Sequence, residues 1–105
     1  MGEIVFSWRE TWGSKGKQAR FKLTPPQAAS IMDMRERVQK SGRDEYIVMG
    51  ETAYGLTEIQ ARKASNTEGW VDGDIVCAID GYPYVSEPLS AGKLEKLERL
   101  ANTRI

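Results

Sequence analysis

The chain has 105 residues, and its fifteen basic and fifteen acidic side chains give a formal net charge of zero at pH 7. A neutral chain has no overall field that draws it to nucleic acid or to a membrane surface. With no histidine and one cysteine, the usual cysteine–histidine zinc sites, the Ser–His and Cys–His catalytic pairs and an intrachain disulfide are all excluded.

The N-terminal segment, residues 3–23, is predicted to form a β-hairpin. Residues 3–9 and 18–23 alternate between apolar and polar side chains, the two-residue period of a strand. The apolar side of the two strands carries Ile4, Phe6, Trp8, Ala19, Phe21 and Leu23. Gly13–Gly16 between them reads as a turn, and the polar side of the second strand is expected to face water.

A central helix is predicted at about residues 25–41. Thr24 and Gln27 have the spacing of a capping box, proline is tolerated in the first helical turn, and Gly42 suits a left-handed C-terminal cap. Helical periodicity places one apolar face toward the core: Ala28, Ile31, Met32 and Val38.

Arg35 interrupts this apolar face. In the first interpretation its methylene groups cover the edge of the core while the guanidinium reaches water. In the second, the guanidinium is presented to a carboxylate or phosphate of a partner. The first interpretation is the more ordinary one.

Two further segments follow the helix. The apolar run in Glu45–Gly50 predicts a buried strand, in a central position with both faces covered. Residues 56–66 fit two structures. Thr57 and Gln60 form a second possible capping box, whereas a strand would place Ile59 and Ala61 inward. Helix propensity favours a short helix.

The C-terminal third is predicted to contain a hairpin and a helix. Strands at Ile75–Ile79 and Tyr82–Val85 flank Asp80-Gly81, a strong hairpin signal, and Pro83 marks the return strand as an edge. Ser86 or Ser90 caps the final helix, whose apolar stripe is Leu94, Leu97, Leu100 and Ala101. Strands and helices mixed without strict alternation indicate a single α+β domain, residues 1–105.

Few residues offer chemistry. Cys77 shares its strand face with Ile75 and Ile79, so we expect a buried thiol and no nucleophile. Asp72-Gly73-Asp74 could hold a hard cation, but the remaining ligands of a calcium loop are missing. We therefore predict no enzyme, no cofactor and no metal.

The location is inferred from what the sequence lacks. No apolar run is long enough to span a bilayer, and no signal-peptide pattern opens the chain. The single cysteine is compatible with a reducing compartment. We expect a cytoplasmic protein that does not contact membranes.

The distribution of charge suggests a protein-binding function. Between Ala64 and Gly92 there are five acids and no basic residue, and aromatic side chains there could give contact area while charge steers a partner. The predicted acidic aromatic face consists of Glu68, Trp70, Asp72, Asp74, Asp80, Tyr82 and Tyr84. The hypothesis is an adaptor or inhibitor that masks a basic or nucleic-acid-binding surface of a larger protein.

The alternative hypothesis is a nucleic-acid-binding module that uses the basic N-terminal hairpin. Its candidate residues are Arg9, Trp12, Lys15, Lys17, Arg20 and Lys22. The plain alternative to both is an ordinary solvated surface, and a homodimer through the C-terminal leucine stripe is a further hypothesis. The small size suggests an accessory protein, for instance of viral or mobile-element origin.

Overall fold

The computed structural model describes residues 2–8, 18–52, 55–64, 71–80 and 85–103. Within these ranges the elements follow in the order β1 (Gly2–Ser7), β2 (Gln18–Leu23), α1 (Pro25–Ser41), β3 (Glu45–Thr52), β4 (Gly55–Arg62), β5 (Asp74–Ile79) and α2 (Ala91–Ala101). This is an α+β fold, as the sequence predicts.

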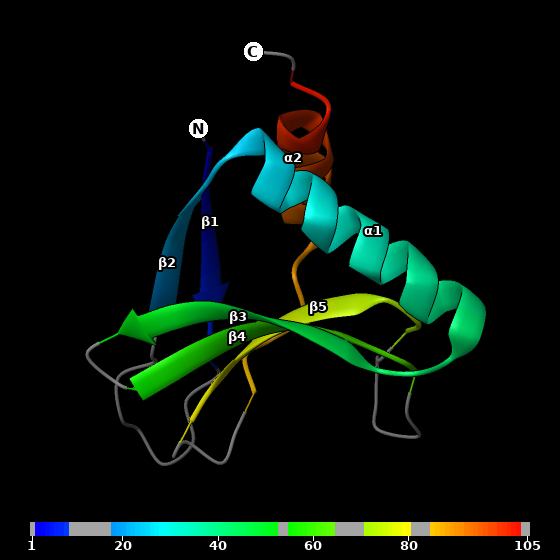
Figure 1. The fold of residues 1–105 in the computed structure, drawn as a ribbon, viewed down its shortest axis with the longest axis horizontal. Coiled ribbons are helices and arrows are strands. Elements are labelled where there is room, and N and C mark those ends of the chain that lie inside the picture. Colours follow the sequence, from blue (N-terminus) through cyan, green and yellow to red (C-terminus); the bar gives the residue numbers. More distant parts are fainter. Residues whose placement is uncertain (1, 9–17, 53–54, 65–70, 81–84, 104–105) are drawn as a thin grey trace.

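The strands form two antiparallel sheets. β1 pairs with β2, as predicted for the N-terminal hairpin, and β3, β4 and β5 form a second sheet in that order. Helix α1 lies across the second sheet and packs on β3 and β4, while α2 packs on α1 and β1 (Figure 1). The core fills the space between the two sheets and the helices.

The segment that follows the second sheet joins the two sheets. The backbone N–H groups of Ser86 and Leu89 donate to the carbonyls of Cys77 and Ile75 on β5, and the N–H of Glu87 donates to the Ser7 carbonyl on β1. The outward carbonyl groups of β5 therefore have hydrogen-bond donors within the chain.

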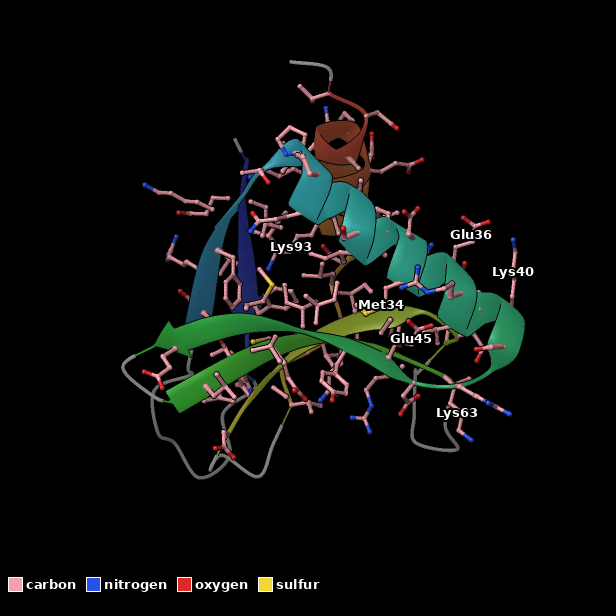
Figure 2. The ribbon with its side chains drawn as sticks, viewed as in Figure 1. Met34, Glu36, Lys40, Glu45, Lys63 and Lys93 are labelled. Atoms are coloured by element: carbon pink, nitrogen blue, oxygen red, sulfur yellow. The ribbon has the colours of Figure 1, made fainter. Side chains whose placement is uncertain are left out.

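The outer edge of β1 is covered by α2. Lys93 Nζ donates to the Val5 carbonyl at 2.8 Å, and Lys96 Nζ donates to the Glu3 carbonyl at 2.8 Å. Figure 2 shows Lys93 extending from the helix toward β1. Each ammonium group replaces a neighbouring strand as the donor to an edge carbonyl.

Helix α1 begins and ends where the sequence indicates. Thr24 N–H donates to Gln27 Oε1 at 2.9 Å and Gln27 N–H donates to Thr24 Oγ1 at 3.3 Å, which completes the capping box. Gly42 takes the left-handed conformation at φ 69°. The buried face is Pro25, Ala28, Ile31, Met34 and Val38, so Met34 occupies the core position that the sequence analysis gave to Met32, which is half-buried.

The packing of the Arg35 methylene groups that the first interpretation predicts is present in the structure. The stem of Arg35 packs against the turn before β5, because a Cβ atom on Gly73 would lie 3.0 Å from Arg35 Cγ. Its Nε atom is buried and finds no hydrogen-bond partner among the described residues. Arg35 therefore serves chiefly as a long apolar spacer between α1 and this turn.

The predicted short helix at residues 56–66 is wrong, and β4 takes its place. Thr57, Ile59 and Ala61 are buried in alternation, and both edges of β4 pair with neighbouring strands. This pairing and burial outweigh the weak local preference for a helix. The strand alternative, with Ile59 and Ala61 inward, is confirmed.

The predicted central position of β3 is also wrong, because β3 is an edge strand. Ile47 and Met49 pack against the core, whereas Tyr46 and Val48 on the opposite face are 65% and 51% exposed. The apolar run therefore reflects one face that meets the core and one that meets solvent.

The C-terminal predictions hold where the structure describes them. β5 and its buried Cys77 are confirmed, and the return strand of the predicted hairpin lies largely at residues 81–84, outside the described ranges. Ser90, not Ser86, caps α2. Leu97 is buried, and Leu94, Leu100 and Ala101 pack against the core.

Candidate functional site

The described part of the acidic aromatic face stabilises a turn. Ala64 N–H donates to Asp72 Oδ1 at 2.6 Å, and Val71 N–H donates to Asp74 Oδ2 at 2.9 Å. Asp74 is only 8% exposed. The carboxylate of Asp74 is therefore used inside the fold.

Asp80 lies far from these two acids. It follows the last residue of β5, whereas Asp74 is the first residue of this six-residue strand, which puts the two about 20 Å apart along the chain. Glu68, Trp70, Tyr82 and Tyr84 lie outside the described residues. The described acids thus do not gather into one surface.

The described part of the basic hairpin consists of Arg20 and Lys22, both exposed on β2. Arg20 Nη1 lies 3.0 Å from Glu3 Oε1 on the neighbouring strand, so an internal acid already partly neutralises it. Arg9, Trp12, Lys15 and Lys17 lie outside the described residues. The nucleic-acid alternative therefore gains no support here.

Cys77 is buried in the core on β5. Burial raises the pKa of its thiol to about 12, and the nearby charge of Glu58 acts in the same direction. A thiol that stays protonated at neutral pH is a poor nucleophile.

A hollow of about 370 Å³ lies between α1 and α2. Its lining includes Arg35 together with the acids Asp33, Glu36 and Glu98. Because carboxylates outnumber the guanidinium there, the hollow offers an anion no net attraction.

The outer edge of β3 carries unpaired backbone groups, and its register shows which ones they are. On β5 the carbonyls of Ile75 and Cys77 point away from β4, since they accept bonds from the joining segment. Antiparallel strands alternate in the side to which their backbone groups point. Even-numbered residues of β4 therefore bond to β5, as the bond from Asp80 N–H to the Leu56 carbonyl illustrates.

The odd-numbered residues of β4 consequently bond to β3. Ile59 and Ala61 face Ile47 and Glu45, so the backbone N–H and C=O groups of Tyr46 and Val48 point away from the sheet. Neither residue makes a backbone hydrogen bond on that side to any residue that the structure describes. An open edge of this kind is ready to pair with a further strand.

The side chains next to this edge are apolar on both faces of the sheet. Tyr46 and Val48 stand on the outer face, where Leu56 of β4 is also 42% exposed. On the inner face a groove of about 160 Å³ separates β3 from α1. Its lining consists of Gln27, Ser30, Ile31, Ile47, Val48 and Met49. A space of roughly 150 Å³ admits one benzene-sized group.

Helix α1 holds β3 at one end. The guanidinium of Arg37 binds Glu45 at 3.0 Å, and this carboxylate raises the pKa of Arg37. Figure 2 shows Glu45 beneath α1, below Glu36 and Lys40. The groove lies at the N-terminal half of α1 and this ion pair at the C-terminal half, so the contact leaves the groove accessible.

Acidic side chains surround the same edge. Glu51 is exposed near the end of β3, Asp44 is exposed just before its start, and Glu58 stands opposite Val48. The apolar run of β3 predicts a strand inside the sheet, and that wrong position hides this site. The signal was the pair of acids, Glu45 and Glu51, that bracket the apolar run, a pattern more typical of an edge than of a buried strand.

The described residues contain no group of three or more side chains placed to hold a metal ion. Nor does any helix in the described part of the chain have the length and apolar character needed to cross a membrane. Comparisons with protein-family models, with curated proteins and with solved structures found no match.

Proposed function

We propose that this chain is a non-catalytic protein-binding module of the adaptor or inhibitor type, and that it binds an extended segment of another protein as an added strand on β3. The binding surface is the β3 edge, by which we mean the outward backbone groups of Tyr46 and Val48 and the groove beside them. It replaces the acidic aromatic face that the sequence suggests. The observation that carries it is this unpaired edge with apolar side chains on both faces.

Strand addition suits this geometry. Backbone hydrogen bonds from Tyr46 and Val48 supply affinity without regard to the partner's sequence, and pockets for alternate side chains supply specificity. The described outer edges of β1 and β5 are already covered by α2 and by residues 86–89, so β2 and β3 are left for a further strand, and β3 has the apolar groove beside it. In the cytoplasm, where we place the protein, the buried thiol of Cys77 would remain reduced.

The test is a proline placed on the open edge. Val48→Pro removes one outward N–H group and leaves the bonds between β3 and β4 intact, because Val48 does not bond to β4. The matched control is Lys22→Pro on β2. By the same alternation the backbone N–H of Lys22 points away from β1, so this proline also removes an outward N–H group and leaves the bonds between β1 and β2 intact. Wild type and both variants are used to capture proteins from a lysate of the cells that make the chain.

We expect a protein captured by wild type and by Lys22→Pro to be lost with Val48→Pro, while circular dichroism shows all three folded. Capture that is equal for Val48→Pro and wild type would refute binding at β3. Failure of the wild type to capture any protein would refute the protein-binding function itself.

A further inference from the structure

The acids around the β3 edge define the chemistry of the segment that it binds. We infer that this segment is a short apolar stretch bracketed by two basic residues, six positions apart, and that it pairs antiparallel to β3. The inference rests on the proposed function and specifies the ligand of the same edge.

The positions follow from the register of β3. An added antiparallel strand that bonds to Tyr46 and Val48 has its side chains facing alternately outward and inward. The residue opposite Ile47 then points to the inner face, into the groove under α1. The residues opposite Tyr46 and Val48 point to the outer face, next to exposed apolar side chains.

The bulge in β3 sets the spacing between the acids. Val48 pairs with Glu58 but Gly50 pairs with Thr57, so β3 contains one extra residue at this point. Glu51 is thereby brought onto the outer face with Tyr46 and Val48, in line with its partner Leu56. By the same alternation Asp44 lies on this face at the opposite end of the strand.

Both ends of the outer face thus carry a carboxylate, but only that of Glu51 is left for the added strand, because Asp44 is engaged at the end of β4. Both oxygens of Asp44 have partners, since Oδ1 accepts the Lys63 N–H at 2.8 Å and Oδ2 lies 3.8 Å from Arg62 Nε. Glu51 makes no ion pair with any residue that the structure describes, and Glu58 adds charge nearby. A basic residue opposite Glu51 therefore gains the most from the pairing.

The same charges disfavour a second copy of this chain as the occupant. An antiparallel pair of β3 strands that satisfies the outward groups would set Tyr46 of one copy against Val48 of the other. The bulge then brings Asp44 of each copy opposite Glu51 of the other. Two pairs of like charges directly across from each other destabilise such a dimer.

Two matched peptides test the charge preference. The first is acetylated and amidated Lys-Thr-Val-Ile-Val-Thr-Lys, in which the central Ile faces the groove, and the second has Glu in place of both Lys. Each is titrated into ¹⁵N-labelled wild type, into Glu51→Lys, and into Glu95→Lys. The last variant makes the same change of charge at an exposed position of α2.

We expect the basic peptide to shift the amide signals of Tyr46 and Val48 and to bind roughly three- to tenfold more tightly than the acidic one. Glu51→Lys should largely remove this preference, because Asp44 and Glu58 remain, and Glu95→Lys should preserve it. Equal binding of both peptides at β3 would overturn the charge inference and leave strand addition standing. Absence of any shift at Tyr46 and Val48 with millimolar peptide would overturn the inference outright.

Sedimentation of the free protein tests the competing occupant. We expect a monomer at all concentrations up to the hundred-micromolar range. A dimer that Val48→Pro dissociates would show that a second copy occupies β3, and would overturn the inference. Capture of a cellular protein through β3 would remain a separate test of the proposed function.

Discussion

Gly73 shows how one residue without a side chain lets two elements approach. It has φ +85°, and an added Cβ would lie 2.8 Å from Gln39 Cγ and 3.0 Å from Arg35 Cγ. The left-handed conformation costs an L-residue about 1–2 kcal/mol. The turn and α1 can therefore contact each other this closely only with glycine at this position.

Replacement of Gly73 by alanine should destabilise the fold both through the backbone and through this contact. Gly42→Ala is the matched control, because Gly42 also has positive φ, +69°, but open space around its Cα. We expect Gly73→Ala to lower the free energy of unfolding by at least about 1 kcal/mol more than Gly42→Ala, since overpacking adds to the backbone cost. Urea denaturation measures both, and equal losses would contradict the proposed close packing.

The Cys77 thiol links stability to pH. Because burial raises its pKa from 9.0 to about 12, the folded state holds a proton that the unfolded state loses above about pH 9. The free energy of unfolding therefore decreases as the pH rises from about 9 toward 12. Below pH 9 the thiol is protonated in both states and causes no loss of stability.

The predicted result is a steeper loss of stability above pH 9 for wild type than for Cys77→Ala. Comparing the two proteins by urea denaturation at pH 8 and pH 10 removes the effects of lysine and tyrosine, which titrate in both. At pH 8 the native thiol should also resist a thiol reagent that modifies the urea-unfolded chain within minutes. Parallel pH profiles would show that the thiol already titrates in the folded state as it does in the unfolded one.

At the scale of elements, the strands β1 and β3 differ in how their outer edges are treated. The β1 edge is closed by two ammonium groups from α2, whereas the outward groups of Tyr46 and Val48 on β3 have no backbone partner among the residues that the structure describes. Protection of one edge by lysine is a common way to prevent unwanted pairing. This contrast distinguishes β3 from β1 as a surface for an added strand.

Lys93→Met should destabilise the fold because it leaves the half-buried Val5 carbonyl without its donor. The methionine retains most of the packing of the lysine stem, so the loss isolates the hydrogen bond at about 1–3 kcal/mol. Lys40→Met is the control, since Lys40 is exposed and its ammonium group bonds to Glu36 on its own helix. Thermal denaturation should show a clear decrease in melting temperature for Lys93→Met and little change for Lys40→Met.

The local signals of the elements were readable in the sequence, and the strand order was not. Thr24, Gln27 and Gly42 fix the ends of α1 by bonds within a few residues, and the alternation around Phe6 and Phe21 fixes one hairpin. The residues of β4 favour a helix when only their local preference is considered. They form a strand because their pairing partners lie elsewhere in the chain. The candidate site depends on β3 being at an edge. The acids Glu45 and Glu51 favour an edge position, but they do not specify which strand pairs with β3.

At the scale of the whole molecule, residues 86–89 make the two sheets depend on each other. Ser86 is the centre of this junction. Its N–H donates to the Cys77 carbonyl, and its buried hydroxyl accepts the Cys77 N–H at 2.7 Å. The next N–H, that of Glu87, donates to Ser7 on the other sheet. Loosening of this segment therefore exposes edges of β1 and β5 together.

Ser86→Ala should consequently weaken the whole fold and not one sheet alone. The buried Cys77 N–H would lose its acceptor, at a cost of about 1–3 kcal/mol. Ser30→Ala is the control, because the hydroxyl of Ser30 is exposed and bonds only within α1. Unfolding in urea should remain one transition, with the same midpoint by tryptophan fluorescence and by far-ultraviolet circular dichroism, and that midpoint should fall for Ser86→Ala. Two separated transitions in the variant would mean that the sheets fold independently and that residues 86–89 merely connect them.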